Sequence, residues 1–203
     1  MSIIYFVDTE TTGLNPHAGH TIIEFCCVKH VNRKEVERLS FKVIPTSEDL
    51  ALADKTALSI NKFDLEEWHK YGISQHLAAK KISEMIIGSS GSALIGHNVK
   101  FDIAMIKQLM KKTGTEHRLP YRCIDSQSAA YAQFEPLGLR SFSMDSIRAW
   151  LGWSAHNAHT AEQDTEDLIK LWDILSPRPI DDQSVAIKEL IVNRRIKHAK
   201  SIN

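Results

Sequence analysis

The chain has 203 residues, 43% of them hydrophobic, and its 25 basic and 25 acidic side chains give a formal net charge of zero. This length supports one well-filled α/β domain, and the charge balance differs from the strongly basic composition of proteins that coat nucleic acid in bulk. Three cysteines without metal-ligand spacing argue against a disulfide framework. The apolar runs are too short for a signal peptide or a membrane span, so we expect a cytoplasmic protein.

The first predicted strand leads into two acidic residues. Residues 3–7 are aliphatic, β-branched or aromatic, which is typical of a strand buried on both faces. Side chains alternate along a strand, so Asp8 and Glu10 share one side with Ile4 and Phe6. Two neighbouring inward-facing carboxylates repel each other, and a carboxylate removed from water is costly unless it is paired or bound to a cation. The pattern is a first indication of a metal site.

The following segment is predicted to mix strands and helices. Two strands, 21–31 and 36–44, are joined by a short turn at 32–34 that favours an antiparallel hairpin. After them we expect, in chain order, a loop with helical pieces (45–63), a helix (73–87), a linker (88–92) and a fourth strand (93–96).

A second acidic position begins the next predicted helix. Asp102 is followed by Met105, Ile106 and Leu109 at helical spacing, which places it on the apolar face of a helix that ends at Gly114. It also lies near the helix N-terminus, where backbone N–H groups favour negative charge. Beyond this helix we expect a fifth strand at 121–124 and helices from 126 and over 143–151.

The last predicted helix of the domain, 161–175, has a similar arrangement. Thr160 and Gln163 form a T-x-x-Q capping box, so we expect the helix to begin just before Asp164 and His159 to lie on the preceding loop. Apolar residues follow Asp164 on its face: Leu168, Leu171, Trp172 and Leu175. A third acidic position therefore points toward the interior.

The chain after residue 176 differs from the rest, and we divide it into a domain, 1–176, and a helical basic tail, 177–203. Basic side chains gather near its end: Lys188, Arg194, Arg195, Lys197 and Lys200. One interpretation is a contact with nucleic acid or a partner through phosphate charges. The favoured interpretation is a helix that packs on the domain, with a basic end that complements the helix dipole.

Four carboxylates and one histidine could together carry out phosphodiester chemistry. Asp8, Glu10, Asp102 and Asp164 offer oxygen ligands alone, which suits Mg²⁺ or Mn²⁺. Two such ions, about 4 Å apart, can activate an attacking water and stabilise the leaving 3′-oxyanion. His159, on a loop beside the metals, is a natural general base.

Three motifs resemble those of the DEDDh (DnaQ-like) 3′–5′ exonucleases, which include the proofreading epsilon subunit of bacterial DNA polymerase III and ribonuclease T. D-x-E-T-T-G-L spans 8–14, H-N-x-x-F-D spans 97–102 and H-x-x-x-x-D spans 159–164. Ser143-Met144-Asp145 matches a serine-leucine-aspartate segment that usually precedes the third motif. The resemblance covers roughly residues 3–175. It implies an RNase H-like α/β fold, with a central mixed five-stranded sheet and helices on both faces.

The resemblance also implies roles for individual residues. The four carboxylates would bind two Mg²⁺ or Mn²⁺ ions, and His159 would deprotonate the water. Leu14 would wedge against the terminal base, the backbone of Thr11, Thr12 and Gly13 would contact the 3′-end, and His97 and Asn98 would support the same region. One departure occurs at Asn61-Lys62, where many relatives have histidine followed by glycine. This departure concerns substrate preference rather than metal chemistry.

A few residues near the motifs have two interpretations. His156 lies three residues before His159, but the five-residue step to Asp164 favours His159 as the base. Trp68 lies near the Asn61-Lys62 departure and could either stack on a base or pack in the core. The other tryptophans follow helical core patterns and are expected to pack: Trp150, Trp153 and Trp172.

We expect a metal-dependent 3′–5′ exonuclease that releases nucleoside 5′-monophosphates from single-stranded ends, with DNA as the favoured substrate. The alternatives are a non-catalytic module that binds nucleic acid or a polymerase, and an oligoribonuclease-type RNA exonuclease. Sequence motifs do not show contacts to the 2′-hydroxyl, so they do not decide whether the substrate is DNA or RNA. The pathway, the protein partner and the oligomeric state also stay open.

Overall fold

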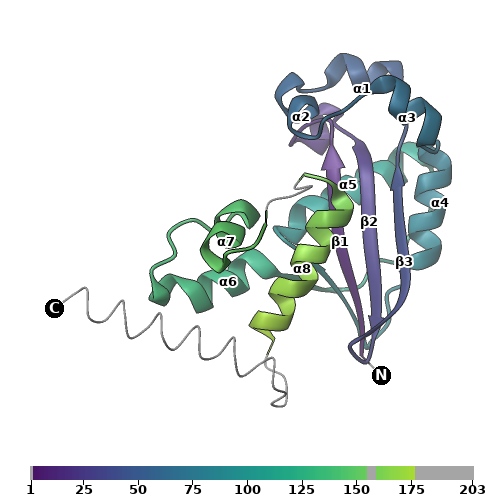
Figure 1. Ribbon diagram of the computed structural model, residues 1–203. Coiled ribbons are helices and arrows are strands. Elements are labelled where there is room, and N and C mark those ends of the chain that lie inside the picture. The colour runs from purple at the N-terminus through teal and green to yellow at the C-terminus, as the bar shows by residue number, and fades with distance from the viewer. Residues whose placement is uncertain (1, 155–158, 177–203) are drawn as a thin grey trace.

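The protein is built on one mixed five-stranded sheet with strand order β3-β2-β1-β4-β5 (Figure 1). A computed structural model describes residues 2–154 and 159–176. The strands are β1 (Ile3–Thr11), β2 (Ile22–Val31), β3 (Lys34–Lys42), β4 (Ser92–Gly96) and β5 (Arg122–Asp125). The β1–β2 and β2–β3 pairs are antiparallel, whereas β1–β4 and β4–β5 are parallel. The predicted mixed sheet of five strands is confirmed.

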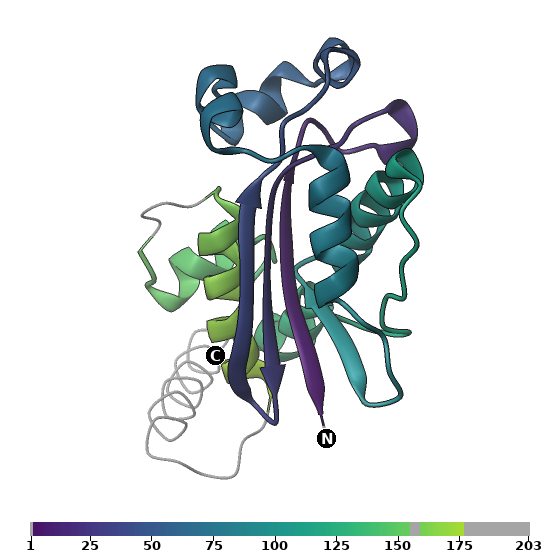
Figure 2. The same cartoon turned by 90° about the vertical axis from the view of Figure 1, so that its right-hand side faces the viewer.

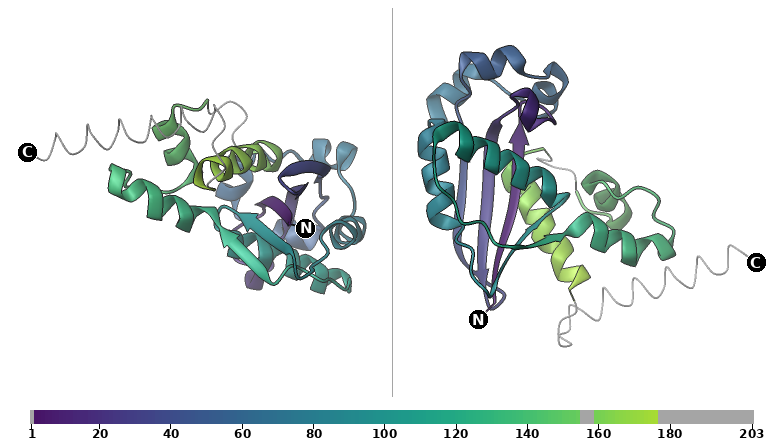
Figure 3. Two further views of the ribbon diagram at one scale, coloured as in Figure 1. Left: turned by 90° about the horizontal axis from the view of Figure 1, so that it is seen from below. Right: turned by 180° about the vertical axis from the view of Figure 1, so that it is seen from behind.

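Helices cover both faces of this sheet, as predicted (Figure 2). Their bounds are α1 (Ser47–Leu52), α2 (Lys55–Ile60), α3 (Leu65–Tyr71), α4 (Gln75–Met85), α5 (Val99–Thr113), α6 (Ser126–Phe134), α7 (Met144–Leu151) and α8 (Ala161–Leu175). Helices α4 and α5 close a core on one face, which Figure 3 shows from behind, and α6, α7 and α8 close a second core on the other. Within the described residues, no helix is both long and apolar enough to cross a membrane.

Strand β1 supplies side chains to both cores. Val7 lies in the core beneath α4 and α5, and Phe6 lies in the core beneath α6 and α8. The alternation continues along the strand, so Asp8 lies on the α8 side and Thr9 on the α5 side. The strand is longer than predicted, because its pairing with β2 continues to Thr11. The first acidic residues therefore lie on hydrogen-bonded backbone rather than on a loop.

The hairpin between β2 and β3 is tighter than predicted. Asn32 and Arg33 both have positive φ, at 49° and 68°, and Lys34 already belongs to β3. A two-residue turn with left-handed backbone matches the twist of the two strands it joins. The predicted antiparallel hairpin is confirmed, with one turn residue fewer.

Helix α3 was not predicted from the sequence, and it is only seven residues long. Its N-cap is Asp64, whose side chain accepts from the backbone N–H of Glu67. Trp68 is its one buried residue, at 1% exposure, and its indole Nε1–H donates to the carbonyl oxygen of Ile23 at 2.8 Å. Lys42 lies over the indole ring. Trp68 therefore packs in the core, and the base-stacking interpretation is wrong.

Helices α1 to α3 lie beyond the C-terminal end of β1 (Figures 1 and 2). The backbone N–H of Asp54 donates to the carbonyl oxygen of Thr12 at 2.8 Å, and the side-chain amide of Asn61 donates to that of Thr11 at 3.0 Å. These bonds attach the segment of α1 to α3 to the C-terminal end of β1.

Trp150, Trp153 and Trp172 pack against the second core, as predicted. The tail from residue 177 and His156 lie outside the described residues.

Candidate metal centre and active site

Three carboxylates from two elements converge at the C-terminal end of β1. Asp8 and Glu10 come from β1 and Asp164 comes from the first turn of α8. Ligand oxygens of all three lie within 4.8 Å of one another. An all-oxygen, all-acidic donor set of this kind fits a hard divalent cation such as Mg²⁺ or Mn²⁺.

The electrostatics of this cluster show an excess of negative charge. Burial raises the pKa of Asp8 well above its usual value, and repulsion from Asp102, Asp164 and Glu10 raises it further. Burial, followed by repulsion from Asp164 and Glu24, raises the pKa of Glu10 to about 8. A cation would remove both the repulsion and much of the burial penalty, since carboxylates taken from water need a positive partner.

Asp102 approaches the same end of β1 from the opposite core. It is 3% exposed and accepts a hydrogen bond from the Thr9 hydroxyl at 2.8 Å. Burial raises its pKa to about 7, and its charge contributes to the raised pKa of Asp8. A Cβ on Gly96 would lie 3.0 Å from Asp102 Oδ2, so glycine leaves the room that this carboxylate occupies. Asp102 is thus a neighbour of the three-carboxylate cluster rather than a member of it.

His159 lies on the loop before α8, as predicted. Its backbone is left-handed, with φ of 66°, and its side chain is 40% exposed. Its backbone N–H donates to Asp164, and its Nε2 lies 3.8 Å from Asp145 Oδ2. The Thr160 hydroxyl caps α8 by accepting from the Gln163 backbone N–H. The helix therefore begins at residue 161, three residues before Asp164, and matches the predicted range 161–175.

The first motif continues into a buried turn with one projecting side chain. Thr11 and Thr12 are buried; the Thr11 hydroxyl donates to the carbonyl oxygen of Gly13, and the Thr12 hydroxyl accepts from the backbone N–H of Thr21. Both threonine side chains are thus engaged inside the protein. Leu14, in contrast, is 79% exposed. An exposed apolar side chain four residues after Glu10 is available for contact with another molecule.

His97 and Asn98 hold neighbouring elements together. The Nε2–H of His97 donates to the carbonyl oxygen of Phe142 at 2.8 Å, which leaves Nδ1 to accept from the Ser126 hydroxyl at 3.0 Å. Burial lowers the pKa of His97, so the neutral ring matches this arrangement. The backbone N–H of Asn98 donates to Asp125. These contacts fix the turn from β4 into α5, on which Asp102 lies.

The departure at Asn61-Lys62 has a structural counterpart. Lys62 has a positive φ of 51°, the backbone region in which glycine is favoured. Glycine adopts such a conformation without a steric penalty, whereas Lys62 adopts it with one. Asn61 uses its side-chain amide to hold the end of β1, as described above.

One important residue was missed from the sequence: Arg148 of α7. Its guanidinium is 2% exposed and donates to three carboxylates, Asp145, Asp164 and Asp167, at 2.8, 2.5 and 2.8 Å. The available signal was its position on the apolar face of α7, four residues after Met144 and next to Ile147. A charged residue there indicates a buried ion pair, but the sequence does not identify the partner.

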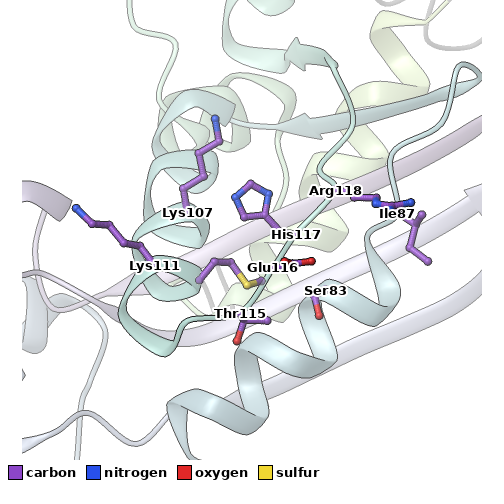
Figure 4. A pocket seen from close by; sticks show the side chains of 9 residues that line it. Ser83, Ile87, Lys107, Lys111, Thr115, Glu116, His117 and Arg118 are labelled. Carbon is purple, nitrogen blue, oxygen red and sulfur yellow. The ribbon is translucent and has the colours of Figure 1, made fainter.

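A basic hollow of about 620 Å³ lies away from these residues, at the other end of α5 (Figure 4). Its polar lining includes Ser83, Lys107, Lys111, Glu116, His117 and Arg118. None of the predicted site residues lines it. The hollow is therefore separate from the carboxylate cluster.

Comparison with known proteins gives a consistent result. A model of the exonuclease family (RNase_T) matches residues 5–172. DNA polymerase III subunit epsilon of Treponema pallidum is 26% identical over 168 residues, which cover 81% of this chain and 72% of that protein. The chain therefore belongs to the exonuclease family.

Solved structures of E. coli exonuclease I share the fold. The complex with a dT13 oligonucleotide has a TM-score of 0.74 at 20% identity, and the complex with a dA16 oligonucleotide has a TM-score of 0.71 at 22% identity. Each comparison covers 88% of this chain and 42% of the other, so the chain spans less than half the length of exonuclease I. The predicted RNase H-like fold is confirmed.

Proposed function

We propose that this chain is a DEDDh-type 3′–5′ exonuclease that releases nucleoside 5′-monophosphates from single-stranded DNA ends. The observation that carries the proposal is the convergence of Asp8, Glu10 and Asp164 within 4.8 Å, with Asp102 beside them. Membership of the exonuclease family supports the reaction class. The oligonucleotide complexes of exonuclease I support single-stranded DNA as substrate, and the epsilon relative supports a polymerase as partner.

The residues present fit a pair of divalent ions. Mg²⁺ or Mn²⁺ ions held by Asp8, Glu10, Asp102 and Asp164 would supply a low-pKa water and stabilise the leaving 3′-oxyanion. The chain's own contribution is to fix the ligands. Pairing with β2 holds Asp8 and Glu10, and the Thr9 hydroxyl orients Asp102.

His159 would take the proton from the attacking water. Its loop position and partial exposure leave the ring accessible to a water between protein and substrate. Leu14 would contact the terminal base, because its side chain is exposed and the first motif places it four residues after Glu10. The backbone of Thr11 to Gly13 would bind the 3′-end, and His97 and Asn98 would hold the turn that carries Asp102.

The proposal is tested with a 5′-labelled single-stranded DNA oligonucleotide in Mg²⁺ or Mn²⁺, beside duplex DNA and RNA of the same sequence. We expect a ladder of shortened products on single-stranded DNA, no products in EDTA, and no ladder when the 3′-terminal linkage is a phosphorothioate. Asp8→Asn should abolish the ladder. His159→Ala should lower kcat about 10²–10⁴-fold with little change in KM, the usual contribution of a positioned base.

The matched control is Glu84→Gln, which removes an exposed carboxylate of α4 and should leave the rate unchanged. A wild-type protein that binds the oligonucleotide without shortening it at any concentration would contradict the proposal and favour a binding module. A faster ladder on RNA than on DNA would retain the chemistry and overturn the substrate preference.

A further inference from the structure

The buried arginine of α7 has a geometry that a simple ion pair does not require. The three donors of Arg148 point to three different carboxylates: Nε to Asp167, Nη1 to Asp145 and Nη2 to Asp164. Two of these acids lie outside the metal cluster, and Asp164 lies within it. The guanidinium therefore connects the cluster to α7.

Asp167, which lies outside the metal cluster, balances the positive charge of Arg148. Asp167 is 2% exposed, and its carboxylate also accepts from the Gln163 side-chain amide at 3.1 Å and from Lys170 Nζ at 3.0 Å. Burying a guanidinium is costly unless it is paired and hydrogen-bonded. The ion pair with Asp167 offsets the free-energy cost of burying the guanidinium. It also fixes the orientation of the planar guanidinium group, with Nη2 directed at Asp164.

The two helices that meet at this arginine carry the proposed catalytic groups. Asp164 lies on α8, and Asp145, the acid of the serine-methionine-aspartate segment, faces His159 across 3.8 Å. Arg148 thus contacts a proposed metal ligand directly and reaches the loop of the proposed base through one intervening carboxylate.

We propose that Arg148 is a positioning residue, which holds Oδ1 of Asp164 so that this carboxylate is already oriented before a divalent ion binds. The inference rests on the proposed function, because it needs Asp164 to be a metal ligand. Residues that orient a metal ligand contribute about 10–100-fold to metal affinity or activity. The orientation comes from the shape of the guanidinium fork, not from its charge alone.

The test is Arg148→Lys, which keeps the charge and loses the fork. Mn²⁺ binding to the nucleic-acid-free protein is measured by isothermal titration calorimetry, and kcat and KM on single-stranded DNA are measured at saturating Mn²⁺. We expect the Mn²⁺ Kd to rise about 10-fold or more and kcat to fall about 10-fold or more, with KM for the oligonucleotide unchanged. Full retention of both Mn²⁺ Kd and kcat in a folded Arg148→Lys protein would overturn the inference.

Lys170→Met is the matched control, since Lys170 contacts the far side of the same Asp167 and does not touch Asp164. It should leave Mn²⁺ Kd and kcat unchanged; a loss equal to that of Arg148→Lys would make the effect one of general stability and overturn the inference. If Arg148→Lys does not fold, Arg148→Gln with Asp167→Asn removes both charges of the buried pair together and should show the same losses. A wild-type protein that neither binds Mn²⁺ nor cuts DNA refutes the proposed function itself.

Discussion

At the residue scale, the acids of the cluster differ in what surrounds them. Asp8 is surrounded by other carboxylates, which raise its pKa in addition to the effect of burial. Asp164 has Arg148 beside it, and the guanidinium lowers the pKa of Asp164 against the opposing effect of burial. The same substitution therefore removes mainly repulsion at Asp8, whereas at Asp164 it removes repulsion together with the attraction to Arg148.

We expect Asp8→Asn to stabilise the metal-free protein more than Asp164→Asn does. At pH 8 in EDTA, Asp8→Asn should raise the free energy of unfolding by about 1–3 kcal/mol, because it removes a buried repelled charge. Asp164→Asn should raise it by less, because the variant relieves the repulsion but takes a charged partner from Arg148. Urea unfolding of both variants measures this. A gain in the free energy of unfolding for Asp164→Asn that equals or exceeds the gain for Asp8→Asn would contradict the role given to Arg148.

At the element scale, secondary structure was predictable where the sequence contains a strong local signal. The acids of the second and third motifs lie on helices as predicted, and α5 stops at the predicted Gly114, whose left-handed backbone caps the helix. Helix α3 was missed because a single indole buried against β2 stabilises it, and this tertiary contact has no period in the sequence. Arg148 was recognisable as unusual but its role was not, since its partners on α8 lie 16 and 19 residues away.

The five proposed catalytic residues were named from the motifs, and the structure brings three of their carboxylates into one cluster. The sequence could not show that Asp102 arrives from the opposite core, because that depends on how α5 packs on the sheet. Nor could it show that Thr11 and Thr12 direct their hydroxyls inward, since this requires the hydrogen bonds made at the end of β1.

The attachment of α3 gives a prediction at this scale. Trp68→Phe removes the bond to the Ile23 carbonyl and weakens the contact with Lys42. We expect the free energy of unfolding to fall by about 1–3 kcal/mol, the usual cost of leaving a buried polar group unpaired. KM for the oligonucleotide, measured on folded protein, should stay the same, because the indole is inside the core. A large rise in KM without a loss of stability would restore base stacking as its role.

At the scale of the whole molecule, a chain with no net charge concentrates negative charge at one end of its sheet. The pKa values of Glu10 and Asp102 are raised to about 8 and about 7, and those of Asp8 and Asp164 are also raised. In the unfolded chain these acids ionise near pH 4. Between about pH 4 and pH 8 the metal-free folded state therefore binds more protons than the unfolded state, and its stability falls as pH rises.

We expect this contribution to make the stabilising effect of divalent ions depend on pH. At pH 5.5 Glu10 and Asp102 are largely protonated in the folded state, and their protons compete with the metal, whereas at pH 8 both acids are more ionised. Mg²⁺ or Mn²⁺ should therefore raise the melting temperature more at pH 8 than at pH 5.5. Thermal denaturation with and without EDTA measures the difference. Asp8→Asn with Glu10→Gln is the control, and an unchanged metal effect in that double variant would place the ions elsewhere.

Strand β1 lies between the helical layer of α4 and α5 and the helical layer of α6, α7 and α8. Asp102 belongs to the layer of α5 and Asp164 to the layer of α8, with Asp8 on the strand between them. In the proposed enzyme, bound ions would cross-link α5, β1 and α8 through these carboxylates. The supply of divalent ions would then govern how long each molecule survives proteolysis as well as how fast it works.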